Sequence, residues 1–320
     1  MLTLNDLDPD QTAAIDYCFE NNETFLIAGM GAGKSIIALT AIEELLAEPN
    51  IPVDRVLVLA PLKVCNKVWR HEHKLWEHTQ HLKVQVITGK ERKLDFKADI
   101  VVLNFDLLQW FAEQNWWHHF DGLVVDESTK LKGGGQWFKA LRHHIKDFYW
   151  RLVMTGTPVS ENWNQLFYQM FLVDGGDTFG RNRQKWLESF FYPTDYKRYN
   201  WVPIPGIENR LTSMISPYVY TVPDYRASLP SLTVELIATP LPPPARLAYK
   251  EMAGKMETQG ILAQNAATKS MKLTQIANGF IYDDDGQTIH LHDAKEAALK
   301  NLIFDFDFST NAVLIIYQFK

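Results

Sequence analysis

Short, nearly continuous aliphatic runs recur along the first half of the chain, and segments of helical periodicity separate them. Strands buried on both faces of a parallel sheet have this character, because neither side of such a strand meets water. The runs predict strands at residues 25–27, 55–60, 84–87, 100–103, 123–125 and 151–155. Helices are predicted at about 9–19, 36–46, 64–76 and 163–172. Strands that alternate with helices indicate an α/β domain with a mostly parallel sheet covered by helices.

Residues 173–230 break this alternation, because they are rich in aromatic residues with basic and proline residues interspersed. We predict a mostly helical insertion there, with its helical part from about Lys185 to Tyr218. A second unit is predicted over residues 231–320, with strands at Leu232–Leu236 and Ala312–Ile316 and helices at about 245–257, 264–277 and 294–304. One strand at the end of the chain does not complete a parallel sheet, so we expect this second domain to be incomplete.

A glycine-rich turn follows the apolar run Phe25–Ile27 and precedes the helical segment that begins near Ile36. This order is the context of a phosphate-binding loop, in which glycines let successive backbone N–H groups point at phosphate oxygens. We expect Lys34 to reach the β- and γ-phosphates and the Ser35 hydroxyl to ligate Mg²⁺. The turn therefore predicts a nucleoside triphosphate site made by Gly29, Met30, Gly31, Ala32, Gly33, Lys34 and Ser35.

Two further motifs stand at the ends of later strands. Asp126 and Glu127 close the run 123–125, where one carboxylate can hold Mg²⁺ and its neighbour can accept a proton from the attacking water. The alternative for this pair is a solvated strand end. A Thr-Gly-Thr-Pro turn at the end of the run 151–155 can connect the acidic pair to a neighbouring domain. Its coupling residues are Thr155, Gly156 and Thr157.

The net charge of −6 does not favour a nucleic-acid partner, but the charges are unevenly distributed. Residues 55–100 hold ten Lys and Arg against five acidic residues, and residues 130–151 hold six against one. A chain with basic stretches of this kind can carry a phosphate-binding face although its overall charge is negative.

Cys18 and Cys65 are too few for a disulfide framework, so they suit a reducing cytoplasm and are expected in the core. The first segment, Met1 to Asn22, is polar and acidic, unlike a signal sequence. No apolar run approaches the roughly 20 residues that span a bilayer. We therefore expect a cytoplasmic location and no membrane partner.

The three motifs, in this order, resemble motifs I, II and III of superfamily 2 helicases. Other stretches resemble the Swi/Snf-type branch of that superfamily, whose members are translocases on double-stranded DNA. Leu59–Trp69 is similar to motif Ia, Asp126–Lys132 to the extended Asp-Glu box, and Val313–Phe319 to motif IV. The resemblance covers nearly the whole chain, and the compact sequence favours a phage or bacterial member.

The resemblance implies an N-terminal RecA-like ATPase lobe over residues 1–230 and the start of a second, incomplete RecA-like lobe over residues 231–320. It implies a motor that hydrolyses ATP to ADP and phosphate with Mg²⁺ and couples hydrolysis to movement on duplex DNA. Gln11 matches the glutamine that reads adenine in the family. The location that the resemblance implies is the cytoplasm of a bacterium or of a phage-infected host cell.

Two departures from the family pattern bear on activity. Thr129 stands where histidine is frequent, so the coupling between motifs II and III can differ. Motifs V and VI, with the arginine fingers of the second lobe, would lie beyond Lys320, and such fingers raise turnover by about 10³–10⁵. We therefore expect weak hydrolysis. The alternatives are a nucleotide- and DNA-binding module without productive turnover, an RNA helicase and a small-molecule kinase, although a kinase leaves the Thr-Gly-Thr-Pro turn unexplained.

Cations near the motifs predict contacts with nucleic acid. Lys63, Lys67 and Arg70 recur at helical spacing and place three charges on one face, and Lys132 follows the Asp-Glu box. The alternative for these cations is a solvated surface. The insertion is a further candidate through Arg181, Arg183, Lys185, Lys197 and Arg198. Four aromatic residues that could stack on bases are expected instead to pack against the sheet, namely Trp110, Trp116, Trp117 and Phe120.

Overall fold

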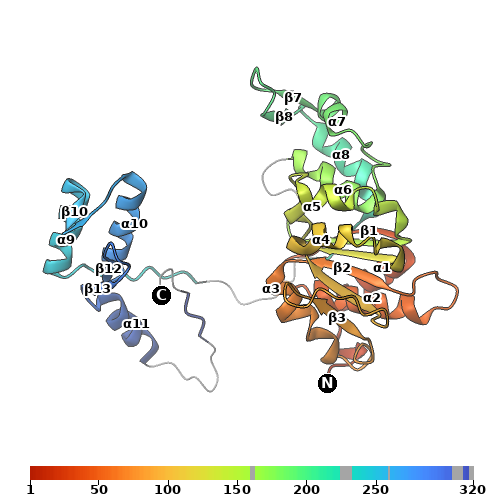
Figure 1. Cartoon of the computed structure of the whole chain (residues 1–320), viewed down its shortest axis with the longest axis horizontal. Coiled ribbons are helices and arrows are strands. Elements are labelled where there is room, and N and C mark those ends of the chain that lie inside the picture. The colour runs from red at the N-terminus through yellow and green to blue at the C-terminus, as the bar shows by residue number, and fades with distance from the viewer. Residues whose placement is uncertain (159–162, 224–232, 259, 305–312, 317–320) are drawn as a thin grey trace. The chain divides into compact units, whose positions relative to one another are not determined.

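The computed structural model describes residues 1–158, 163–223, 233–258, 260–304 and 313–316. The chain forms two compact units, Met1–Leu229 and Pro230–Lys320 (Figure 1). The first unit contains a large sheet with helices on both faces, and the second contains helices and short hairpins. Within the described residues, every helix is too short or too polar to cross a membrane.

A seven-stranded sheet forms the centre of the first unit, in the order β3-β4-β2-β5-β6-β1-β9, and every neighbouring pair is parallel. The strands are β1 (Glu23–Ile27), β2 (Val56–Ala60), β3 (Val84–Ile87), β4 (Ile100–Asn104), β5 (Gly122–Asp126), β6 (Trp150–Thr155) and β9 (Val219–Thr221). Every residue of β2, β4, β5 and β6 is buried, as their continuous aliphatic runs require. The predicted α/β class and parallel sheet are confirmed.

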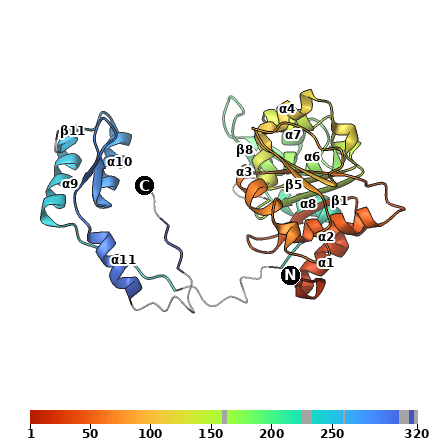
Figure 2. The ribbon, with the colours of Figure 1, turned by 60° about the horizontal axis from the view of Figure 1, so that its bottom comes forward.

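Two helical layers cover the two faces of the sheet (Figure 2). One layer contains α1 (Pro9–Glu20) and α2 (Lys34–Ala47), whose buried side chains form one core with the sheet. The other contains α4 (Leu108–Glu113), α5 (Gln136–Leu141) and α6 (Leu166–Asp174), which form the second core. Trp117 and Phe120 are buried in this second core, and Trp110 and Trp116 pack against it, so the expectation of core packing is confirmed.

The helix predicted at 64–76 is wrong as a single element. The chain forms one short turn, α3 (Leu62–Val64), then a π-helix, η2 (Cys65–Trp69), and then a 3₁₀ turn, η3 (Glu72–Lys74). The wide turn is closed by the backbone N–H of Arg70, which donates to the carbonyl of Cys65 at 3.2 Å. Cys65 and Trp69 are buried against the α1–α2 side of the sheet. Single π turns of this kind are frequent at functional sites.

The insertion is helical only in part, which corrects the prediction for 185–218. It contains α7 (Arg183–Phe190), a hairpin of β7 (Phe191–Pro193) and β8 (Trp201–Pro203), α8 (Ile207–Ile215) and η9 (Ser216–Tyr218). The hairpin forms because Phe191 and Trp201 are buried in the core beneath it while Tyr192 and Val202 face outward. The chain then returns to add β9 beside β1, an edge strand that its short sequence did not reveal.

The second unit packs a small core around Met252, Ile276 and Ile281. Its elements are α9 (Pro243–Lys255), β10 (Glu257–Thr258), β11 (Ile261–Leu262), α10 (Ala266–Ala277), β12 (Phe280–Tyr282), β13 (Thr288–His290) and α11 (Ala294–Phe304). The three predicted helices are confirmed.

The two strands predicted for the second unit are wrong where they can be seen. The described residues Thr233–Leu236 and Val313–Ile316 belong to no strand, and their apolar side chains are exposed. A strand needs a neighbour to satisfy its backbone, and β-propensity alone does not provide one. Leu232, Ala312 and the residues 317–319 of the motif IV-like stretch lie outside the described residues.

A buried arginine joins β6 to the two elements that flank it. Arg151 is 6 % exposed, and its Nε donates to the carbonyl of Val173 at 2.7 Å. Its Nη1 donates to the carbonyls of Ile145 and Phe148, and its Nη2 forms an ion pair with Glu23. The guanidinium thus satisfies the ends of α6 and η7 (Ile145–Asp147) at the amino edge of the sheet.

We predict that Arg151→Met destabilises the first unit by about 3 kcal/mol, because it leaves buried carbonyls and the Glu23 carboxylate without their donor. The midpoint of urea unfolding, followed by tryptophan fluorescence, measures this change. The exposed Arg70 gives a matched control, since Arg70→Met is expected to change stability by no more than about 0.5 kcal/mol. Equal midpoints for the two variants would contradict the structural role of Arg151.

Candidate nucleotide and nucleic-acid site

The three motifs meet at one edge of the sheet. They follow β1, β6 and β5, which lie side by side in that order. In the strand register Ile27 lies opposite Thr155, and Asp126 lies opposite Met154, so the strands end level with one another. Ligands of open parallel sheets bind outside this carboxyl edge. The edge is therefore the candidate site.

The glycine-rich turn joins β1 to α2. Gly31 and Gly33 have φ angles of 82° and 79°, a left-handed conformation that glycine adopts without strain. Gly33 is the N-cap of α2, so the turn delivers the chain directly to the amino end of a 14-residue helix. That end carries unpaired N–H groups and the positive end of the helix dipole, which together favour an anion.

Lys34 is half-buried at the start of α2, and its Nζ donates to the carbonyls of Ala28 and Gly29, both at 2.9 Å. The ammonium group thus lies against the turn itself rather than in solvent. Ser35 follows at the second position of the helix. A lysine and a hydroxyl at the amino end of one helix can serve phosphate and a divalent cation, respectively.

Gln11 packs α1 onto this turn. Its Nε2 donates to the carbonyl of Ala32 at 3.2 Å, and its Oε1 accepts from the backbone N–H of Asp8 at 3.0 Å. A Cβ at Gly33 would lie 2.2 Å from the Gln11 amide nitrogen, so a side chain at that position would displace the Gln11 amide. The residue predicted to read adenine therefore lies at the border of the phosphate-binding turn.

Asp126 is the last residue of β5 and is only 5 % exposed. Burial raises the pKa of its carboxyl group above the ordinary value, although a hydrogen bond from Trp69 and the charge of Lys34 act in the opposite direction. The Trp69 Nε1–H donates to Oδ2 at 3.0 Å, and Trp69 itself is fully buried. The structure thus brings Lys34, Trp69 and Asp126 together from three separate segments.

Glu127 has a φ of 62°, which is uncommon for a residue other than glycine. Its Oε1 accepts a hydrogen bond from the Thr129 hydroxyl, so the residue that stands in the place of histidine contacts the acidic pair. The left-handed turn separates the two carboxyl side chains: Asp126 is buried, and Glu127 is partly exposed. Two adjacent acids in unlike surroundings can take different tasks.

The Thr-Gly-Thr-Pro turn contacts the phosphate-binding turn. The backbone N–H of Ala28 donates to the carbonyl of Thr155 at 3.0 Å, and the N–H of Thr157 donates to the Thr155 hydroxyl at 3.1 Å. A Cβ at Gly156 would lie 3.3 Å from the carbonyl oxygen of Ala28. The turn is therefore packed directly against the start of the phosphate-binding turn.

Gln169 connects this turn to the acidic pair. It lies on α6 and is fully buried. Its Oε1 accepts from the Ser128 hydroxyl at 2.8 Å, and its Nε2 donates to the carbonyl of Pro158 at 2.6 Å. Sequence reasoning missed both Gln169 and the contact of Trp69. An amide in an otherwise apolar helix was the available signal for Gln169, since a buried amide requires partners.

The cations predicted to contact nucleic acid lie on two segments beyond this edge. Lys63, Lys67 and Arg70 are exposed, while Cys65 and Trp69 between them face the core. Lys132 follows η6 (Ser128–Leu131), the turn that begins after Glu127. A hollow of about 450 Å³ opens next to it, lined by Lys130, Leu131, Gly133, Gly135, Gln136, Trp137 and Phe138.

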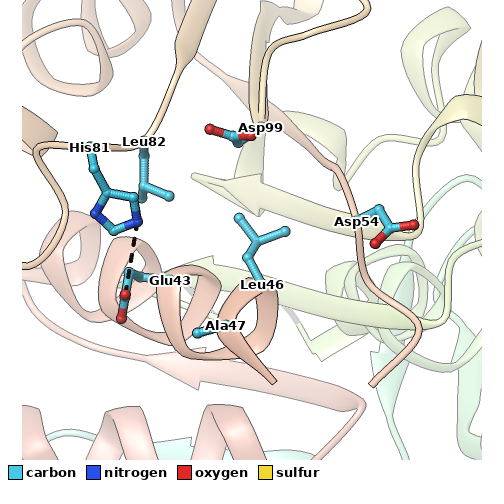
Figure 3. Close-up of a pocket in the computed structure, with 7 residues that line it drawn as sticks. All are labelled: Glu43, Leu46, Ala47, Asp54, His81, Leu82 and Asp99. Carbon is cyan, nitrogen blue, oxygen red and sulfur yellow. Dashed lines mark ion pairs between the residues drawn. The ribbon is translucent and has the colours of Figure 1, made fainter. Parts of the chain in front are cut away.

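A second hollow, of about 260 Å³, lies at the opposite edge of the sheet (Figure 3). Asp54 and Asp99 precede β2 and β4 there, and His81 forms an ion pair with Glu43 of α2 at 3.9 Å. Asp99 accepts a hydrogen bond from the backbone N–H of Lys83 at 2.7 Å, so its carboxylate binds the backbone directly before β3. This hollow contains none of the predicted site residues.

Comparisons with known proteins agree with this architecture. The family model of the SNF2-related domain matches residues 14–289. The protein p41 of Acyrthosiphon pisum secondary endosymbiont phage 1 is 30 % identical over 346 residues, which cover 98 % of this chain and 72 % of p41. The CHD3-type chromatin-remodeling factor PICKLE of Arabidopsis thaliana is 24 % identical over 178 residues, which cover 46 % of this chain and 12 % of PICKLE.

Two solved structures share the fold. The Sulfolobus solfataricus SWI2/SNF2 ATPase core in complex with dsDNA has a TM-score of 0.56 and 19 % identity, and covers 86 % of this chain. The core domain from the same organism has a TM-score of 0.55 and 21 % identity, with the same coverage of this chain. The chain spans 58 % and 57 % of these two structures, respectively.

The raised pKa of Asp126 generates a prediction on stability. The folded chain binds the Asp126 proton more tightly than the unfolded chain does. The stabilisation from this group is thus complete below the unfolded pKa, near 3.8, and is lost as the pH rises through the raised folded value. Asp126→Asn does not ionise. We therefore predict that, without nucleotide or Mg²⁺, the Tm of Asp126→Asn relative to the native chain increases as the pH rises.

Thermal unfolding in a series of buffers from mildly acidic to mildly alkaline checks this prediction. If Asp126→Asn is more stable than the native chain by about 1 kcal/mol, its Tm is higher by about 2–4 °C for a domain of 150–250 residues. Asp16→Asn, which removes an exposed carboxylate from α1, is the control for loss of a surface charge. A constant or declining difference between Asp126→Asn and the native chain would contradict the prediction.

Proposed function

The chain belongs to the SNF2-related domain family, and from this premise we propose that it binds ATP with Mg²⁺, hydrolyses it to ADP and phosphate, and couples hydrolysis to movement on duplex DNA. The observation that carries the proposal is the convergence of Lys34, Asp126 and Glu127 at the carboxyl edge of the sheet. Unit Met1–Leu229 would act as the first RecA-like lobe, and unit Pro230–Lys320 as the start of the second.

The phosphate-binding turn fits a nucleotide triphosphate. The left-handed glycines Gly31 and Gly33 hold the turn open at the amino end of α2, and Lys34 supplies a positive charge beside it. On binding, the Lys34 ammonium would exchange its contacts with the Ala28 and Gly29 carbonyls for phosphate oxygens. Gln11, bound to the Ala32 carbonyl, would lie at the adenine side.

The donor set also fits Mg²⁺, which prefers hydroxyl and carboxylate oxygens. Ser35 and Asp126 would hold the ion, directly or through water. The charge of a divalent ion would offset the burial that raises the Asp126 pKa, which supports the assignment of this carboxylate as a ligand. When bound, the ion would neutralise charge on the β- and γ-phosphates.

Glu127 is the proposed general base. Its partial exposure and its hydrogen bond from Thr129 leave a carboxylate oriented at the edge of the site. In the reaction, a water oxygen forms a bond to the γ-phosphorus, the bond to the oxygen of ADP breaks, and Glu127 takes the proton of the water. Lys34 would stabilise the charge on the phosphates during this transfer.

Contacts of the site with neighbouring segments support coupling to DNA. Lys63, Lys67 and Arg70 would bind backbone phosphates, and Trp69 between them donates to Asp126. Lys132 would add a contact after the Asp-Glu box. Thr155, Gly156 and Thr157 would transmit the state of the nucleotide through Gln169, which contacts both Ser128 and Pro158.

Steady-state ATP hydrolysis by the chain tests the proposal. We expect duplex DNA to stimulate turnover more than single-stranded DNA or RNA does, because the Sulfolobus solfataricus core that shares the fold is in complex with dsDNA. Glu127→Gln is the matched control, since it keeps shape and loses the base, and we expect its turnover to fall by about 10²–10⁴ while ATP binding persists. Stimulation by RNA alone would indicate an RNA helicase. Mg²⁺-dependent ATP binding without hydrolysis would indicate a binding module.

Lys34→Ala should weaken ATP binding by about 10- to 100-fold, because it removes charge-assisted hydrogen bonds worth about 1.5–3 kcal/mol. Equilibrium titration with a fluorescent ATP analogue measures this loss. Lys74→Ala removes an exposed cation outside this turn and is the control, for which we expect the native affinity. Native affinity in Lys34→Ala would refute the assignment of the phosphate-binding turn.

A further inference from the structure

Two basic segments that are distant in sequence meet on the face of the sheet covered by α5 and α6. One is the end of α5 and the turn after it, with Lys139, Arg142 and Lys146. The other is the start of the insertion, with Arg181 and Arg183. We call the surface depression that these five cations line the basic groove.

The groove consists of two adjoining hollows of about 150 Å³ and 140 Å³. Both are lined by Arg142, Phe171 and Arg181, so the hollows are continuous. Each is several times larger than the roughly 30 Å³ that one water molecule occupies in the liquid, which leaves room for an anion. The surface is thus a depression lined by lysines and arginines, and not a flat basic patch.

Glycines at the end of α6 allow this close packing. Gly175 and Gly176 have φ angles of 67° and 93°. A Cβ at Gly175 would lie 2.7 Å from the side chain of Lys146, and one at Gly176 would lie 3.1 Å from the side chain of Arg181. The turn after α6 therefore brings two cations against adjacent glycines of the backbone.

Aromatic rings hold the arginines without neutralising them. The Arg142 guanidinium lies 5.9 Å from the ring centre of Phe171, and that of Arg183 lies 5.5 Å from that of Tyr168. Among the described residues, Lys146 forms an ion pair with Asp177, and no carboxylate pairs with the other four cations. The Arg183 Nε–H is buried and has no hydrogen-bond partner within the described part of the chain. Stacked, unpaired guanidinium groups are suited to phosphate.

The groove adjoins the hollow beside Lys132, with which it shares Phe138, but it lies on another face of the sheet than the core that anchors the Lys63 segment. Phe138 and Phe171 belong to the core on the α4–α6 side, whereas Cys65 and Trp69, which anchor the Lys63 segment, belong to the core on the α1–α2 side. Figure 2 shows these helical layers on opposite faces of the sheet. The end of α6 also lies near the amino edge, where Arg151 binds Val173, and thus away from the phosphate-binding turn.

We propose that the basic groove binds the phosphate backbone of a second segment of duplex DNA, distinct from the segment at Lys63, Lys67 and Arg70. The proposal rests on the proposed function, because that function supplies DNA as the partner. A backbone fits because the cations extend over α5, the turn after α6 and the start of α7, as repeated phosphates require. A second segment is proposed because the groove and the Lys63 segment are anchored in cores on opposite faces of the sheet.

The test compares variants in nucleotide-free binding to labelled duplex DNA over a series of salt concentrations. Lys139→Gln with Arg181→Gln removes two exposed cations of the groove. The matched control, Lys250→Gln with Lys255→Gln, removes two exposed cations of α9 that line neither hollow. Because each phosphate contact contributes about 0.9 to the slope of log K against log salt, we expect the groove variant to lose about 1.8 and the control to lose nothing.

A second measurement addresses the second segment. Energy transfer between two differently labelled duplexes reports their bridging by one protein, with sedimentation to verify that the protein is monomeric. We expect bridging by the native chain and by the control. We expect its loss in the groove variant and in Lys63→Gln with Lys67→Gln, although each of these still binds a single duplex.

The outcomes separate this inference from the proposed function. An unchanged salt slope in the groove variant overturns the inference and leaves DNA-stimulated hydrolysis intact. A reduced slope without bridging by the native chain overturns the second segment, because both surfaces then bind one duplex. Absence of duplex binding by the native chain overturns both the inference and the proposed movement on DNA. Binding of polyglutamate, and not of DNA, by the groove would assign it to an acidic protein instead.

Discussion

Burying the Asp126 carboxylate at the end of β5 requires polar partners, because a charge removed from water is strongly destabilising without them. The partners are the Trp69 indole, at 3.0 Å, and the nearby charge of Lys34. Their positions depend on the rest of the domain: the π turn places Trp69, and the left-handed Gly33 starts the helix that carries Lys34. One buried group thus constrains three elements that lie far apart in sequence, and it joins the exposed Lys63–Arg70 surface to the candidate nucleotide site.

A second constraint acts at Glu127, whose left-handed backbone costs about 1–2 kcal/mol in a residue other than glycine. Such conformations persist only where the surroundings determine them. Here the hydroxyl of Thr129 binds the Glu127 side chain, and Ser128 is fixed by Gln169. The same glutamine donates to Pro158, so the acidic pair and the Thr-Gly-Thr-Pro turn are not independent. The threonine in place of histidine therefore keeps a polar contact inside the acidic segment, while the connection between the motifs passes through α6.

The sequence was informative where physical requirements are local. Buried parallel strands need continuous apolar runs, and a phosphate-binding turn needs glycines before a helix, so β1, β2, β4, β5, β6 and the turn were all predictable. It failed where tertiary contacts decide. Residues 64–76 have helical spacing, but the path of the chain changes where Trp69 is buried against Asp126. Thr233–Leu236 and Val313–Ile316 have β-propensity and no partner strand among the described residues. Trp69 forms a hydrogen bond with Asp126, 57 positions away, and Gln169 forms one with Ser128, 41 positions away. No local sequence pattern reveals contacts of this length.

Helix α6 connects the candidate site to the basic groove. It carries Gln169, which contacts Ser128 and Pro158, and two positions later Phe171, which supports Arg142 in the basic groove. The Lys63–Arg70 segment stands in a similar relation to the site, because Trp69 lies beside Arg70 and donates to Asp126. The Lys63–Arg70 segment is thus separated from Asp126 by Trp69 alone, whereas the basic groove is connected to Ser128 through Phe171 and Gln169 of α6. Since packed cores transmit small displacements instead of absorbing them, phosphate bound at the Lys63–Arg70 segment would act on Asp126 through the Trp69 hydrogen bond, and phosphate bound in the groove would act on the segment after Asp126 through α6.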